Sequence, residues 1–94
     1  MDFPFDEPEN VAVFTCFHIM EKNKDICHVF HDNDDGAWQF LCDKKHSMSD
    51  ARIVSLKSIF EKDPSVGALA DMPPGYGATR KNKSSPWMGF KKHP

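Results

Sequence analysis

The sequence lacks the long apolar runs that mark membrane-spanning and secreted proteins. No stretch approaches the roughly 18 consecutive apolar residues that a membrane span requires. The first ten residues, MDFPFDEPEN, are acidic where a signal peptide would be basic, and no apolar segment follows a basic one. We therefore expect a cytoplasmic protein with no membrane association.

Cysteine is scarce, and its number is odd. The three cysteines include no Cys-x-x-Cys pair, which argues against a disulfide framework. A free cysteine usually behaves as a small buried hydrophobic residue. We expect three reduced thiols with structural roles.

Internal repeats, low-complexity tracts and a recognisable catalytic constellation are also missing. The 94 residues are enough for one domain, and 39% hydrophobic residues with eight Phe and two Trp favour a globular fold over disorder. Residues 1–10 contain two prolines and four acidic residues. They predict an extended acidic leader, followed by a single domain over residues 11–94.

The first half of that domain has strand patterns. Residues 11–20, VAVFTCFHIM, are rich in β-branched and aromatic residues and apolar on both faces, which predicts a central strand covered at least partly on two sides. Residues 26–31 and 37–42 predict two further strands around a five-residue loop that ends in Gly36. Residues 51–54 predict a short fourth strand.

A helical segment follows. Ser55 is a good N-cap for a helix from Leu56, Pro64 should end or kink that helix, and Asp63 is placed to cap a second helical turn. Residues 78–90 predict two short strands around a polar turn at 82–85. The predicted fold class is therefore α+β, with an antiparallel sheet of about five strands and one helical segment, about 55–70, packed on one face.

Cysteine and histidine residues raise the question of a metal site. A zinc ion takes about four such ligands at ~2.0–2.3 Å. The candidates are Cys16, His18, Cys27, His28, His31, Cys42 and His46.

Strand geometry argues against a shared ion, because successive side chains point to opposite faces. Pairing His31 with Ala37 across the loop would place Ile26, His28, Phe30, Trp38, Phe40 and Cys42 on one face. The other face would then hold Cys27, Val29, His31, Ala37, Gln39 and Leu41. A bulge would shift this register. We expect no metal and no cofactor, core thiols, a partly buried His28, and His31 and His46 at the surface.

Two alternatives to a simple binding module remain open. One is a metal-binding or thiol-dependent protein that uses Cys16, His18, Cys27, His28 and Cys42; the Cys16–His18 pair by itself is a weak indication of nucleophilic catalysis, and we expect no enzyme. The other is a single-stranded nucleic-acid binder. Its candidate residues are Arg80, Lys81, Lys83, Lys91 and Lys92, with Trp87 and Phe90 among them.

The charge distribution bears on the choice of partner. Residues 1–50 hold eleven acidic residues against four lysines, and residues 51–94 hold eight basic residues against three acidic ones. The acidic half weakens attraction to phosphates, so nucleic acid is not the expected partner. Asp32, Asp34 and Asp35 form an acidic hairpin tip, which lacks the distal Glu of a calcium loop and is a candidate contact for a basic protein partner.

Three segments resemble a known family. These are DGAWQFLC at 35–42, the long segment at 50–80, and SPWMGF at 85–90. They resemble a family of small bacterial proteins with a domain of unknown function, some relatives of which are described as immunity proteins of polymorphic toxin systems. The resemblance covers about residues 26–90. It rests on the ordered series Gly36, Trp38, Val54, Leu56, Ile59, Asp63, Pro64, Leu69, Pro73, Gly75, Ala78, Arg80 and Trp87.

The resemblance brings no catalytic motif with it. We therefore expect a small, non-enzymatic cytoplasmic module that binds another protein, as an immunity or accessory factor, through Asp32, Asp34 and Asp35. The sequence leaves the oligomeric state open.

Overall fold

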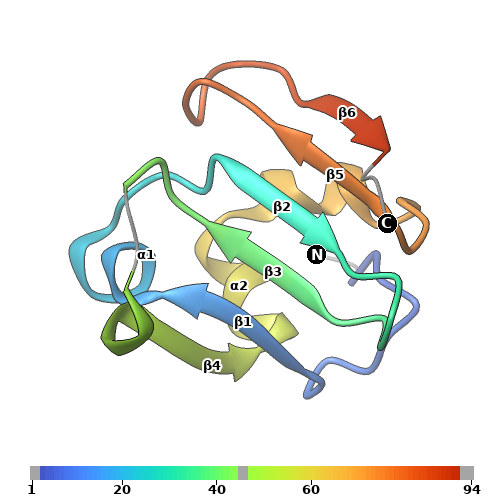
Figure 1. Cartoon of the computed structure of the whole chain (residues 1–94), viewed down its shortest axis with the longest axis horizontal. Coiled ribbons are helices and arrows are strands. Elements are labelled where there is room, and N and C mark those ends of the chain that lie inside the picture. Colours follow the sequence, from blue (N-terminus) through green and yellow to red (C-terminus); the bar gives the residue numbers. More distant parts are fainter. Residues whose placement is uncertain (1–2, 45–46, 92–94) are drawn as a thin grey trace.

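The computed structural model describes residues 3–44 and 47–91, which form a six-stranded sheet with the helical segment of residues 56–69 on one face (Figure 1). The strands are β1 (Ala12–Cys16), β2 (His28–His31), β3 (Trp38–Leu41), β4 (Ala51–Ser55), β5 (Tyr76–Thr79) and β6 (Met88–Lys91). The helices are α1 (Phe17–Lys22) and α2 (Leu56–Lys62), with 3₁₀ segments η1 (Met48–Asp50) and η2 (Pro64–Leu69). The α+β prediction is confirmed at this level. The sheet has one strand more than the expected five.

The strand order is β4-β1-β3-β2-β5-β6, and every neighbouring pair is antiparallel except β1 and β3. These two parallel strands share a single partner pair, Phe14 with Gln39. Because they are parallel, they end at the same end of the sheet. The chain leaves β1 through α1 and passes β3 to reach β2, and it leaves β3 and passes β1 to reach β4 (Figure 1). Two connections therefore cross at one end of the sheet, an arrangement that folds generally avoid.

The hydrophobic core lies between the sheet and the segment formed by α2 and η2. Leu56, Ile59 and Phe60 on α2 and Val66 on η2 are buried against inward-facing strand residues such as Phe40. The predicted helix start is confirmed, because the Ser55 hydroxyl accepts a hydrogen bond of 3.1 Å from the Ser58 amide.

Asp63 caps η2 as predicted and also forms a buried ion pair. Its Oδ1 accepts hydrogen bonds from the amide and the hydroxyl of Ser65, and its Oδ2 accepts one of 2.7 Å from Nη2 of Arg80. Nε of Arg80 donates to the carbonyl of Ile26. This network joins the helical layer to the ends of β2 and β5.

The prediction of one strand over residues 11–20 is wrong in its second half. The strand ends at Cys16, and α1 occupies Phe17–Lys22. The helix buries Ile19 and ends at Asn23, which adopts a left-handed conformation (φ 55°). An apolar run of this length fits either secondary structure, and burial of Ile19 against the core decides for the helix.

The predicted register of the β2–β3 hairpin is also wrong. His31 pairs with Trp38, not with Ala37, and the Asp32 amide donates to the carbonyl of Ala37. Gly36 takes a positive φ of 72° in the turn. This one-residue shift moves one arm to the opposite face. The core face now holds Val29, His31, Trp38 and Phe40, and the open face holds His28, Phe30, Gln39 and Leu41.

Residues of the leader pack against this core. Phe5 is buried and makes edge-to-face contacts with Trp38 and Phe60, and Phe3 contacts Phe60 in the same way. The indole Nε1 of Trp38 donates a hydrogen bond of 2.7 Å to Glu7. Aromatic packing and one hydrogen bond therefore hold residues 3–7 on the domain.

Candidate functional site

Three of the predicted metal ligands lie together where β1 and β3 end. Cys16 is the last residue of β1, His18 is in the first turn of α1, and Cys42 follows β3. Their ligand atoms all lie within 4.8 Å of one another, and the two sulfur atoms are 3.6 Å apart. The expectation that strand alternation keeps the cysteine and histidine ligands from gathering is wrong for these three residues, because the parallel pairing of β1 with β3 brings the end of β3, and with it Cys42, beside Cys16. The expectation of no bound metal stays a prediction.

Burial is the main influence on the acidity of Cys27 and Cys42. It raises the pKa of Cys42 to about 11, and a hydrogen bond from the Lys44 backbone lowers that pKa only in part. Burial likewise raises the pKa of Cys27, helped by the charges of Asp43 and Asp25. Since the thiolate is the reactive form, these environments do not favour a nucleophilic role for either residue.

The other predicted ligands lie apart from this cluster. The thiol of Cys27 is buried and donates to the carbonyl of Lys81 at 3.7 Å. His28 is half-buried, as expected from the sequence, but it lies on the open face of the sheet and not on the face of Trp38. His46 lies outside the described residues.

His31 was expected at the surface and is instead buried. Its ring stacks on Trp38 with centroids 4.0 Å apart, and Glu7 lies 3.8 Å from its Nε2. Nδ1 lies 2.7 Å from the carbonyl oxygen of Met72, and Nε2 lies 3.1 Å from that of Gly36. Its polar contacts therefore tie the β2–β3 turn to the segment before β5, a structural role.

The open face of the sheet has an unusual composition. Along each strand, residues on the open face alternate with residues on the core face. Among the described strand residues, none on the open face is Asp, Glu, Lys or Arg. The large apolar side chains on the face are Phe14, Phe30, Leu41, Ile53, Met88 and Phe90. Four of these are substantially exposed: Phe14 by 42%, Ile53 by 66%, Met88 by 70% and Phe90 by 40%. In a chain with 28% charged residues, such a face is typical of an interaction surface.

A sequence signal for this face was present but was interpreted differently. The apolar residues on both faces of the segment 11–20 predicted a strand covered on two sides, whereas Phe14 is exposed. On the far half of the face, Gly77 leaves room for the rings of Phe30 and Phe90, whose centroids are 6.2 Å apart. A Cβ at Gly77 would lie 2.9 Å and 2.8 Å from these rings. Strand pairing brings these residues together from segments far apart in the sequence.

The acidic tip has internal contacts. Asp32 accepts a hydrogen bond from Gln39, and Asp35 accepts one from the Ala37 amide. Two of the three predicted contact residues thus help to shape the hairpin, and Asp34 is exposed. A partner contact at Asp32, Asp34 and Asp35 stays a prediction.

One of the basic residues predicted to contact phosphates, Arg80, lies in the core of the protein. Arg80 is buried, pairs with Asp63 and stacks on Trp87 with its guanidinium carbon 4.0 Å from the ring centroid. Both side chains are therefore engaged in packing. Lys92 lies outside the described residues.

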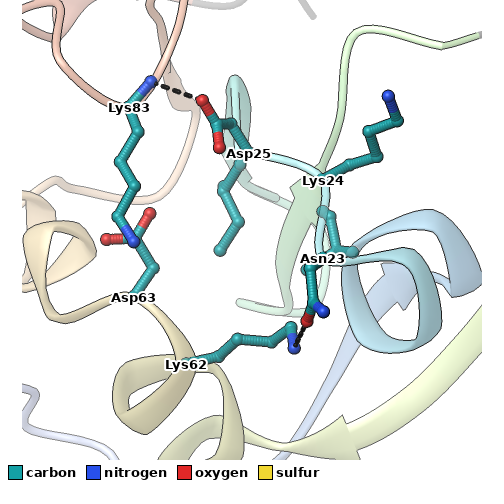
Figure 2. Close-up of a pocket in the computed structure, with 8 residues that line it drawn as sticks. Asn23, Lys24, Asp25, Lys62, Asp63 and Lys83 are labelled. Atoms are coloured by element: carbon teal, nitrogen blue, oxygen red, sulfur yellow. Dashed lines mark hydrogen bonds between the residues drawn. The ribbon is translucent and has the colours of Figure 1, made fainter.

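A surface pocket of about 270 Å³ lies between the ends of α1 and α2 and the turn after β5. Figure 2 shows that its polar groups meet one another: Lys62 donates to Asn23, and the backbone amide of Lys83 donates to Asp25. Asp63, which also lines the pocket, is paired with Arg80. Because these polar groups bond to other groups of the protein, their presence in the pocket does not point to a bound ligand.

None of the helices in the described part of the chain has the length and apolarity of a bilayer crossing. Comparison of the chain with protein-family models, curated proteins and solved structures finds no match. The resemblance to immunity-related bacterial proteins accordingly stays a prediction, and arguments about function rest on the geometry described above.

Proposed function

We propose that this protein is a non-enzymatic protein-binding module whose contact surface is the open face of the sheet. The observation that carries the proposal is the combination of exposed Phe14, Ile53, Met88 and Phe90 with the absence of charged side chains from the described strand positions of that face. Covering such a face removes apolar surface from water without burying an unpaired charge.

The occupant that fits best is a second copy of the chain. A partner with a charged surface would lose hydration against this face and gain no ion pair in return. A second copy presents the same uncharged sheet, and two such faces can pack about a two-fold axis as sheets do in a β-sandwich. An immunity or accessory role would add the binding of a different protein to this self-association.

Sedimentation equilibrium over a wide concentration range tests the proposal. We expect the wild-type chain to dimerise reversibly. Ile53→Lys and Met88→Lys each place a charge on a highly exposed position of the face, and each should weaken dimerisation at least tenfold, because the buried charge would lack a partner.

Met48→Lys is the matched control, since Met48 is 96% exposed but lies in η1, outside the sheet. It should leave dimerisation unchanged. A wild-type chain that stays monomeric at all concentrations would refute the proposal, as would equal weakening by Met48→Lys.

The acidic tip is tested separately. Asp34→Lys reverses an exposed charge without removing the hydrogen bonds of Asp32 and Asp35. If the tip is the contact instead, Asp34→Lys should alter association and its salt dependence while Ile53→Lys has no effect.

A further inference from the structure

We propose that Cys16, His18 and Cys42 form a binding site for a divalent metal ion of the zinc type. The three side chains come from the end of β1, the start of α1 and the residue after β3, and their ligand atoms lie within 4.8 Å of one another. Cys16 and Cys42 are 26 positions apart in the sequence. The fold therefore creates this convergence.

The distance between the two sulfur atoms matches a tetrahedral site. Two sulfur atoms bound to one zinc at ~2.3 Å and a tetrahedral angle lie about 3.8 Å apart, and the sulfur atoms of Cys16 and Cys42 are 3.6 Å apart. The Nδ1 atom of His18 is shielded from solvent. The ligand atoms lie within 4.8 Å of one another, and they would have to draw together where a pair is farther apart than a tetrahedral site allows.

The donor set selects the class of metal. Two sulfurs and one imidazole nitrogen suit zinc and its spectroscopic substitute cobalt(II), whereas calcium and magnesium require oxygen ligands. On binding, each cysteine thiol transfers its proton to solvent, and the two resulting thiolates balance the double charge of the ion. A fourth ligand, from water or from elsewhere in the chain, completes the tetrahedron.

The position of the site gives the ion a structural role. β1 and β3 share only one partner pair, whereas their antiparallel neighbours share four or five. An ion held by Cys16, His18 and Cys42 would join these two strands at the point where the two connections cross. A cross-link between distant segments is most useful in a chain of 94 residues, because small domains bury little core.

Metal binding is tested on untagged, reduced protein with zinc and cobalt(II). We expect one equivalent of zinc by elemental analysis after gel filtration. Cobalt(II) should give the visible absorption of a tetrahedral site and the near-ultraviolet charge-transfer band of thiolate ligation. Zinc should also raise the melting temperature of the wild-type chain and slow hydrogen exchange of amides in β1 and β3.

Variants locate the ligands. Cys16→Ser, Cys42→Ser and His18→Gln should each weaken zinc binding by tenfold or more and abolish the thermal stabilisation. Cys27→Ser is the matched control, because Cys27 is an equally buried cysteine outside the cluster. It should bind zinc as the wild-type chain does.

His18→Gln removes one ligand without disturbing the packing of the core, since His18 is only partly buried and both thiols stay in place. Circular dichroism of the metal-free variants checks that they fold. The proposal is overturned if wild-type protein retains no zinc and gives no thiolate–cobalt band, or if Cys27→Ser loses the metal as the cluster variants do. Dimerisation through the sheet face is measured separately, so either proposal can fail alone.

Discussion

At the scale of single residues, Asp63 and Arg80 form an ion pair of 2.7 Å inside the protein. Both side chains are buried, and Asp63 accepts hydrogen bonds from Ser65 as well as from Arg80. Burial works to raise the pKa of Asp63, but the hydrogen bonds from Ser65 and Arg80 together outweigh it, so the net effect is a lowered pKa. A buried pair of this kind is costly to break, because the remaining charge has no partner.

This lowered pKa predicts an acid-sensitive contribution to stability. A carboxyl whose folded pKa is lower than its unfolded pKa stabilises the fold above the unfolded value of about 3.9, and that stabilisation is lost as pH falls through the folded pKa. Asp63→Asn should therefore lower the free energy of unfolding at pH 7 by about 3 kcal/mol. The same substitution should make the free energy of unfolding fall less steeply as the pH is lowered from about 5 to about 2.

Urea unfolding at a series of pH values measures both effects. Asp34→Asn serves as the control, because Asp34 is an exposed carboxyl of the hairpin tip, and it should follow the wild-type pH profile. A pH profile for Asp63→Asn that runs parallel to that of the wild-type chain would contradict this role of Asp63.

At the scale of elements, α2 has its ends set by local chemistry and its orientation by packing. Ser55 ends β4 and caps the helix with its hydroxyl, and Leu56, Ile59 and Phe60 lie on the buried side. The cap satisfies an amide that the helix itself leaves without a partner. The short helix depends on this cap because it has only seven residues.

Ser55→Ala should destabilise the protein by about 1 kcal/mol, through loss of the cap. Ser55→Asn retains a side-chain oxygen at the same position and should recover most of that loss. Thermal and urea unfolding of the two variants give the comparison. Equal stability of Ser55→Ala and the wild-type chain would show that α2 does not need the cap.

At the scale of the whole molecule, the two faces of the sheet differ sharply. The inner face packs on α2, η2 and the leader residue Phe5, whereas the outer face exposes Phe14 and Ile53. Apolar residues are therefore buried on one face and exposed on the other. Those on the inner face should contribute mainly to the stability of the fold, and those on the outer face mainly to association.

Phenylalanine substitutions test this separation. Phe5→Ala removes a buried ring that contacts Trp38 and Phe60, and should cost about 3 kcal/mol of stability. Phe14→Ala on the open face should cost less than about 1 kcal/mol in the monomer and should weaken dimerisation. Chemical unfolding at low concentration, followed by tryptophan fluorescence, measures the first effect. A larger loss of stability for Phe14→Ala than for Phe5→Ala would contradict this assignment of the faces.

Local sequence by itself determined the α+β class, the caps at Ser55 and Asp63, the break at Pro64 and the approximate positions of most strands. Each of these depends on the conformational preferences and hydrogen bonds of neighbouring residues, which the chain carries wherever it folds. The parallel pairing of β1 with β3, the hairpin register, the burial of His31 and Arg80, and the meeting of Cys16, His18 and Cys42 were decided only by the tertiary structure. The physical reason is that these features depend on which distant surfaces pack together. A one-residue shift in strand pairing, or a strand that gives way to a helix earlier than predicted, changes the neighbours of every side chain that follows.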